Sequence, residues 1–236
     1  MISIQSVYES VKDLANKDQK GFVTPEIFNS FAKIAQLNIY YEMFSDLPEG
    51  NKARRMNVDP SRNLSIVNRA KGDLSTFIER ATVVNDEVTN FFAKPNDFHS
   101  AISIVDITTV TKASNGTICH LLYDEDKIQH ILNSTLSAPS TEFPVALISS
   151  DIEVFPKESI KKIQLSYYRS PITPSYQVFL SGSNSKVELF NPSTSQDFEL
   201  PYHYEQDLVY EIAKMIGVNI RDQQVEVFGR NEDNQS

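Results

Sequence analysis

Residues 16–27, NKDQKGFVTPEI, have residue types and spacing that resemble a calcium-binding loop. Read as a twelve-residue loop, they place Asp18 at the third position and Gly21 at the sixth, where a sharp turn is needed. Two departures argue against calcium. Lys20 stands at the fifth position, where its charge repels a cation, and Ile27 stands at the twelfth, where a bidentate glutamate is required. We interpret the stretch as a polar turn between two helices and predict no metal site.

The other side chains able to bind a metal or act as nucleophiles form no recognised arrangement. The four histidines share no metal-ligand spacing, and adjacent Cys119 and His120 on a strand point to opposite faces, so they cannot readily share an ion. The chain contains no GxSxG, HExxH or glycine-rich phosphate loop. We therefore expect a protein that is not an enzyme and carries no cofactor. The histidines expected to have structural roles are His99, His120, His130 and His203.

The composition narrows the class of protein. The chain of 236 residues is 40% hydrophobic with only 7 glycines, which is typical of a folded protein with a substantial core. Its net charge of −9 argues against a general nucleic-acid-binding surface. The single cysteine excludes an intramolecular disulfide. No apolar run approaches the roughly 20 residues that span a bilayer, and no signal peptide is evident. We expect synthesis in a reducing cytoplasm and no membrane partner.

Positive charge is concentrated in one segment. Between Glu49 and Arg80 there are seven basic and four acidic residues, so the segment is +3 and the remainder of the chain is −12. Basic residues at this density bind either nucleic acid or an acidic surface. Because the remainder is acidic, we favour pairing with a neighbouring subunit; a solvated loop is the alternative. The candidate interface residues are Lys52, Arg54, Arg55 and Arg62.

Helices are expected at both ends of the chain. Apolar residues recur at three- and four-residue spacing over residues 4–15. Thr24 is a suitable N-cap for a second helix, which we expect to stop before Pro48. A third helix follows Pro201, with Gly217 as its expected stop. The expected apolar stripes of the first and last helices are Ile4, Val7, Tyr8, Val11, Leu14 and Ala15, and Tyr204, Leu208, Ile212 and Met215.

The middle of the chain favours strands. Asn115-Gly116 is a hairpin-turn signal, with residues 117–123 as the return strand, and Asp124 is a suitable cap for a short helix. The alternating strand at 160–168 is followed by Pro171 and Pro174, which end strand pairing and stiffen the exit. Further strands are expected at 145–148, 152–155, 176–180 and 187–190.

These elements predict an α+β fold, in which two N-terminal helices and a C-terminal helix form a small bundle beside a β-rich middle region and a long arm. The expected divisions are N-terminal helices over 1–47, an extended basic arm or linker over 48–85, a β-rich region over 86–200, and a helix with a polar tail over 201–236. Tyrosine and arginine are enriched at interfaces, although they also cap core edges. Further interface candidates are Tyr167, Tyr168, Arg169, Tyr202 and Tyr204.

Four segments resemble the ring, or head–tail connector (adaptor), proteins of crAss-like and related tailed bacteriophages. They are residues 16–47, 143–148 (FPVALI), 154–176 (VFPKESIKKIQLSYYRSPITPSY) and 197–222 (DFELPYHYEQDLVYEIAKMIGVNIRD). The resemblance implies a structural virion protein at the portal vertex, made in the bacterial cytoplasm.

The resemblance also implies a homo-oligomeric ring, most simply twelvefold, beneath the portal. Its partners would be the portal, other connector or tail rings, and passing genomic DNA bound without sequence specificity. A ring needs two different patches on each subunit, and the basic arm and the proline-ended strand are the expected suppliers. The alternative is an accessory virion protein, a head decoration or tail component acting as a binding module.

Overall fold

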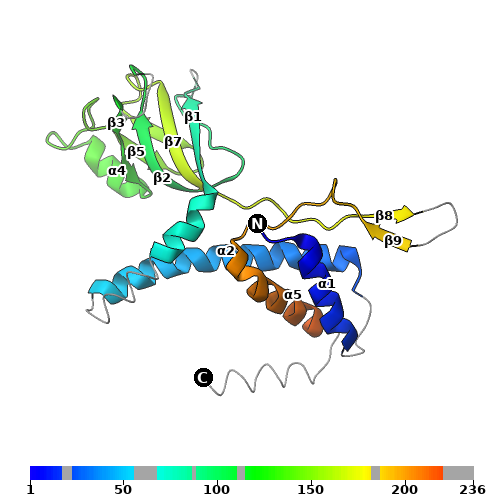
Figure 1. Cartoon of the computed structure of the whole chain (residues 1–236). Helices are drawn as coiled ribbons and strands as arrows, with labels where there is room; N and C mark the ends of the chain where they lie inside the picture. Colours follow the sequence, from blue (N-terminus) through cyan, green and yellow to red (C-terminus); the bar gives the residue numbers. More distant parts are fainter. Residues whose placement is uncertain (18–22, 56–67, 87–88, 111–114, 182–186, 220–236) are drawn as a thin grey trace. The chain divides into compact units, whose positions relative to one another are not determined.

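The computed structural model describes residues 1–17, 23–55, 68–86, 89–110, 115–181 and 187–219 (Figure 1). It confirms a mixed α+β fold with two N-terminal helices and a C-terminal helix. The chain divides into two compact units. Unit 1 comprises residues 1–73 and 171–236, and unit 2 comprises residues 74–170.

Unit 1 contains the helices α1 (Ile4–Lys17), α2 (Pro25–Arg55) and α5 (Glu205–Asn219), the last preceded by the 3-10 turn η3 (Tyr202–Tyr204). The backbone N–H of Ile27 donates to the hydroxyl of Thr24 at 3.4 Å, which confirms the predicted cap of α2. The apolar stripes differ from the expected ones at their ends. Leu14 is 43% exposed and Ile216, rather than Met215, is buried at the end of α5. The helical residues buried in unit 1 include Val7, Val11, Phe28, Ala32, Ile39, Leu208 and Ile212.

The expected helix ends at Pro48 and Gly217 are wrong, because α2 continues to Arg55 and α5 to Asn219. A proline removes one helical hydrogen bond, and the strong helix formers of residues 52–55 lie beyond it. Residues 68–74 are also helical. The predicted extended arm over 48–85 is therefore wrong in its described parts. Residues 56–67, which include Arg62, and residues 18–22 of the calcium-like loop lie outside the described residues.

Two extended segments lie along α2 and bond to its side-chain amides. The amide of Gln36, which is fully buried, donates to the carbonyl of Ile172 at 2.8 Å and accepts from the N–H of Glu199 at 3.1 Å. Two helical turns earlier, the side-chain amide of Asn29 accepts from the N–H of Tyr176 at 2.7 Å and donates to its carbonyl at 3.0 Å. These contacts satisfy backbone groups that a strand would otherwise pair. The segment that follows Pro171 is therefore anchored to α2 of its own chain, whereas its expected role in a subunit contact stays a prediction.

The chain's first residues join the segment that leads into α5. Ile2 pairs with Phe198 as an antiparallel bridge, and the carboxylate of Asp197 accepts from the N–H of Ile4 at 2.9 Å, at the start of α1. Beside this junction, the ring of Tyr8 stacks on Tyr176 with centroids 4.1 Å apart. Segments from both ends of the sequence therefore build one core.

The described residues of unit 2 form two sheets and a helix. The first sheet has the order β1-β7-β2-β3 and is antiparallel, whereas in the second, β4-β5-β6, β4 runs parallel to β5. Asp124 caps α4 by accepting from the N–H of Asp126 at 3.1 Å, as predicted. The elements are η1 (Ser75–Phe77), β1 (Ile78–Val84), β2 (Phe98–Asp106), β3 (Thr117–Ile118), β4 (His120–Leu122), α4 (Glu125–Leu132), β5 (Val145–Ile148), β6 (Ile152–Phe155) and β7 (Lys162–Arg169).

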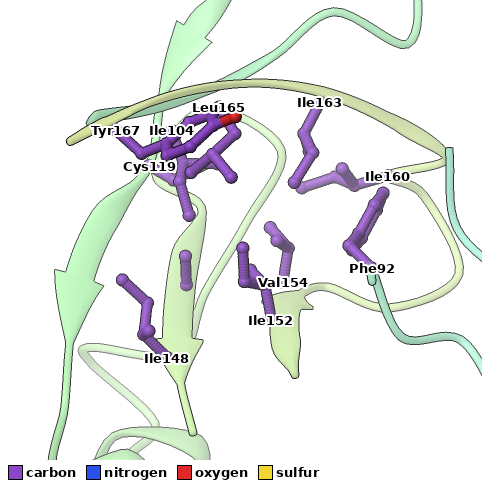
Figure 2. Close-up of a cluster of buried hydrophobic side chains, with 11 residues drawn as sticks. Phe92, Ile104, Cys119, Ile148, Ile152, Val154, Ile160, Ile163, Leu165 and Tyr167 are labelled. Atoms are coloured by element: carbon purple, nitrogen blue, oxygen red, sulfur yellow. The ribbon is translucent and has the colours of Figure 1, made fainter. Parts of the chain in front are cut away.

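Strand β5 is buried on both faces and separates two hydrophobic clusters. Ala146 and Ile148 belong to the main cluster between the sheets, shown in Figure 2, whereas Val145 and Leu147 pack with Ile128 of α4. Successive side chains of a strand point to opposite faces, so alternate residues of β5 enter different clusters. The main cluster comprises Phe92, Ile104, Cys119, Ala146, Ile148, Ile152, Val154, Ile160, Ile163, Leu165 and Tyr167.

The β-rich region has different bounds from those expected over 86–200. Unit 2 begins at residue 74 and ends at 170, where the proline-ended segment begins. The hairpin of β8 (Val178–Ser181) and β9 (Val187–Phe190) belongs to unit 1. The expected return strand over 117–123 is split at Cys119 into β3 and β4, which join different sheets.

Replacement of Gln36 by methionine tests the two hydrogen bonds that join α2 to the extended segments. The substitution removes both amide hydrogen bonds and leaves the carbonyl of Ile172 and the N–H of Glu199 without these partners, so we expect a loss of about 2–4 kcal/mol in unfolding free energy. Urea unfolding followed by circular dichroism measures it. Gln206→Met, at an exposed position of α5, is the matched control and should be nearly neutral. Equal losses in the two variants would contradict the role assigned to Gln36.

Replacement of Gly116 by alanine tests the close approach of β2 to the start of β3. A Cβ atom at Gly116 would overlap the carbonyl oxygen of Asp106 and lie 2.6 Å from Cγ1 of Val105. The backbone must shift, and we expect a loss of about 1–3 kcal/mol in unfolding free energy. Gly72→Ala, in the helix over 68–74, meets no atom within 4 Å and should leave stability unchanged or raise it. Urea unfolding followed by circular dichroism measures both variants. An unchanged unfolding free energy in Gly116→Ala would refute the clash.

Candidate interaction surfaces

The aromatic trio predicted at the end of β7 lies largely within its own chain. Tyr167 is 3% exposed, its ring stacks on Phe98 with centroids 5.7 Å apart, and its hydroxyl donates to Asp97 at 3.0 Å. Burial and the neighbouring Asp97 and Glu79 carboxylates raise the pKa of this hydroxyl. Tyr167 is therefore a core residue, and its assignment to a subunit interface is wrong. Side chains two residues apart on a strand lie on the same face, so the sequence already placed Tyr167 on the buried face with Ile163 and Leu165.

Arg169 and Tyr204, two of the other predicted interface residues, also have partners within the chain. Arg169 is half-buried, with its guanidinium 5.8 Å from the ring of Phe77, and Tyr168 is half-buried beside it. The hydroxyl of Tyr204 donates to Asp73 at 3.2 Å, whereas Tyr202 is 74% exposed. The side chains of Lys52, Arg54, Arg55 and Arg62 lie outside the described residues, although the first three belong to the backbone of α2.

A hollow of about 550 Å³ lies among α2, residues 69–73 and α5. Its buried apolar lining consists of Ile39, Met43 and Ala70. The rings of Tyr204 and Tyr210 also line it. Four carboxylates and one guanidinium complete the lining, a formal net charge of −3. These charged residues are Glu42, Arg69, Asp73, Asp207 and Glu211.

The carboxylate of Asp73 contacts three side chains at one side of the hollow. Its Oδ2 atom lies 3.8 Å from Nε of Arg69, 3.3 Å from Nε2 of His203 and 3.2 Å from the hydroxyl of Tyr204. These contacts connect the end of the helix over 68–74 to the turn that precedes α5. Asp73 therefore has an ion-pair partner in Arg69 and a hydrogen-bond donor in Tyr204, both within unit 1.

Two apolar surfaces of unit 1 face solvent. On α2, Ile27, Ile34 and Tyr41 recur every seven residues and are 39%, 45% and 52% exposed, on the side of the helix away from buried Phe28, Ala32 and Ile39. In the β8–β9 hairpin, Phe179 and Leu189 face each other across the strands and are 47% and 42% exposed. These two strands pair only with each other within the described residues, and an isolated hairpin is marginally stable in water.

The described residues contain no group of three His, Cys, Asp or Glu side chains placed to hold a metal ion. Across the same ranges, no helix is both long and apolar enough to cross a membrane. Cys119 is 3% exposed, and burial together with the charge of Asp106 raises the pKa of its thiol to about 12. It is therefore a core side chain with little thiolate at neutral pH.

Sequence reasoning missed both the hollow and the exposed stripe of α2. The stripe could have been predicted from the sequence, because Ile27, Ile34 and Tyr41 recur every seven residues and therefore lie on one face of a helix. The hollow had none, since its lining comes from three segments up to 172 residues apart in sequence, from Ile39 to Glu211.

No protein-family model matches the chain, and a search of curated proteins finds no relative.

The buried thiol predicts a pH dependence of stability. The folded-state pKa of Cys119 is about 12, whereas an unfolded cysteine has a pKa of about 8.5, so folding favours the neutral thiol. This contribution is complete below about pH 8.5 and is lost as the pH rises towards 12. Between about pH 8.5 and pH 10, we expect the unfolding free energy to fall by up to about 1.4 kcal/mol per pH unit. Urea unfolding across this range should show a shallower slope in Cys119→Ala, and identical slopes would contradict the burial of the thiol.

Proposed function

We propose that the chain is a structural virion protein that forms an oligomeric ring, most simply twelvefold, in the head–tail connector of a tailed bacteriophage. The virion assignment rests on the sequence resemblance over residues 16–47, 143–148, 154–176 and 197–222. The proposed partners are the portal and the adjoining connector or tail rings.

The observation that carries assembly is the exposed apolar stripe of α2. Ile27 and Ile34 are 39% and 45% exposed on α2, whereas Phe28, Ala32 and Ile39 on the opposite side of the same stretch are buried. An apolar face of this kind is stabilised by removal from water, at about 25 cal/mol per Å². The β8–β9 hairpin supplies a second, different apolar surface. A ring requires two such surfaces, because each subunit contacts its two neighbours through different patches.

The acidic composition is compatible with a DNA conduit. A net charge of −9 disfavours tight attachment of phosphates, and a wall that binds DNA weakly lets it pass. The competing proposal is an accessory virion protein, a head decoration or tail component, which would use the same apolar stripe to bind a different virion protein.

The double variant Ile27→Ser/Ile34→Ser tests the stripe. Both side chains are exposed, so the free energy of unfolding should change little, whereas self-association should weaken by about tenfold or more. Sedimentation velocity over a concentration series measures association, with circular dichroism as the folding check. The matched control is Leu136→Ser/Phe143→Ser in unit 2, where the two side chains are 94% and 76% exposed. Unchanged association in the α2 variant would exclude the stripe as an interface.

Electron microscopy separates the two proposals. Rings of the purified chain, formed alone or with a portal protein, and immunogold label at one vertex of each virion support the connector. Label dispersed over the capsid supports the accessory protein. A chain that forms no ring under either condition and is absent from virions would refute both.

A further inference from the structure

Strand β1 is an open edge of the four-stranded sheet in unit 2. It pairs with β7 on one side, and no other strand of the described residues pairs with it on the other. The N–H of Asn85 donates to the carbonyl of Lys161 at 3.0 Å in the register of this ladder, so every second residue before Asn85 also bonds to β7. The backbone groups of Arg80 and Thr82 therefore face the open side.

This edge lacks the usual protection against pairing. Natural edge strands are blocked by proline, by lysine or by bulges. Over its seven residues, IERATVV, β1 contains neither proline nor lysine, and its ladder with β7 runs without a register shift. Ile78 and Val84, on the same face as Arg80, are 41% and 62% exposed. A regular, partly apolar strand with open backbone groups is a site for the addition of another strand.

Strand β9 has a complementary edge. It pairs only with β8 within the described residues, and a third strand would stabilise this otherwise marginal hairpin. The N–H of Asn191 donates to the carbonyl of Gln177 at 2.9 Å in the same ladder, so the backbone groups of Glu188 and Phe190 face the other side of β9. Glu188 is exposed, and in the part of the chain that the structure describes neither it nor Arg80 forms an ion pair.

Charge and alternation together select one register between these edges. Antiparallel addition places the outward-facing residues of the two strands opposite each other. With Arg80 opposite Glu188, Ile78 lies opposite Phe190, so one face gains an ion pair and an apolar pair. A shift of two residues in either direction separates the two charges. Strand β8 offers no charged residue for Arg80, which favours β9 as the added strand.

The same register places the exposed apolar face of the hairpin beside the core-facing side of the sheet. Ala81 and Val83 point to that side and pack against the main hydrophobic cluster of unit 2. Phe179 and Leu189 lie on the face of the hairpin opposite to Glu188 and therefore continue the same side of the sheet. They are 47% and 42% exposed, so their burial adds apolar stabilisation to the backbone pairing.

We infer that β9 of one copy of the chain adds to the open edge of β1 in a second copy, antiparallel to it and with Glu188 opposite Arg80. The contact rests on the self-assembly proposed above and identifies the acceptor of the hairpin. Donor and acceptor are different surfaces of one subunit, so the contact is heterologous and repeats from copy to copy, as a ring requires.

A proline at position 80 tests the backbone pairing. The N–H of Arg80 faces the open edge, so Arg80→Pro removes no hydrogen bond to β7 but blocks the added strand. Self-association should weaken by about tenfold or more in sedimentation velocity. Arg80→Ala, the matched control, keeps the backbone donor and should weaken it by about threefold. Circular dichroism checks folding. Equal association constants in the two variants would overturn the strand addition.

Charge exchange tests the register. Arg80→Glu and Glu188→Lys should each weaken self-association by about three- to tenfold, because like charges then lie opposite each other. An equimolar mixture of the two variants should recover it, since each reversed charge meets its opposite on the other copy. The controls Lys71→Glu and Glu142→Lys make the same changes at exposed positions elsewhere and should have little effect. A mixture that associates no better than the single variants would overturn the register.

Disulfide formation locates the contact and does not depend on the proline variant being folded. Glu79 and Leu189 form a non-hydrogen-bonded pair in this register, with Cβ atoms about 4.5–5.5 Å apart. Glu79→Cys and Leu189→Cys, mixed under mild oxidation, should give a covalent dimer that neither variant gives alone, and the native Cys119 is buried. Glu79→Cys with Phe179→Cys is the control, because β8 lies about 5 Å farther away. A disulfide to position 179 instead would overturn the assignment to β9.

The outcomes separate this inference from the proposed function. Rings that form without the disulfide would overturn the contact and leave the connector proposal standing. The disulfide in an assembly that closes into no ring would support the contact and contradict the ring. Loss of association with a portal or tail protein in Arg80→Pro, without any association between copies, would assign the edge to that partner and overturn the contact.

Discussion

The buried amide of Gln36 lies where three segments of unit 1 meet: α2, the residues after Pro171, and those before α5. Its two hydrogen bonds align both extended segments along the helix. Through the second segment, they set where α5 begins, and thereby place Tyr204 and Asp207 opposite Met43. The apolar packing of the bundle supplies most of its stability, but it is not directional. Together with the bonds of Asn29 and the bridge between Ile2 and Phe198, the directional bonds of Gln36 position the segments that adjoin the hollow.

Local signals predicted a large part of the fold. The strands over 145–148, 152–155 and 187–190 have the expected bounds, because short apolar or alternating runs mark strands. The caps at Thr24 and Asp124 also form as expected. The failures share a cause. Pro48 and Gly217 are unfavourable in helices by a few kcal/mol at most, and the residues around them still continue the helix. Propensity alone therefore misplaced both ends.

The candidate surfaces were less predictable than the elements that carry them. Tyr167 resembled an interface residue in composition, but its alternation with Ile163 and Leu165 required burial. The hollow depends on which helices are neighbours, and this depends on long-range pairs such as Ile2 with Phe198. No local pattern encodes such pairs. The seven-residue repeat of Ile27, Ile34 and Tyr41 was readable, but the stronger stripe through Phe28 and Ile39 on the same helix obscured it.

The insertion of unit 2 between the two parts of unit 1 has a consequence for protein synthesis. A ribosome releases α1 and α2 first and then the whole of unit 2, whereas Asp197, Phe198 and α5 emerge last. Unit 2 can therefore fold on the nascent chain while the bundle waits for its final helix. A chain interrupted before residue 197 has a folded β-rich unit and no completed hollow. The hollow is therefore completed only in chains whose translation has passed α5, because Tyr210 and Glu211 of this helix line it.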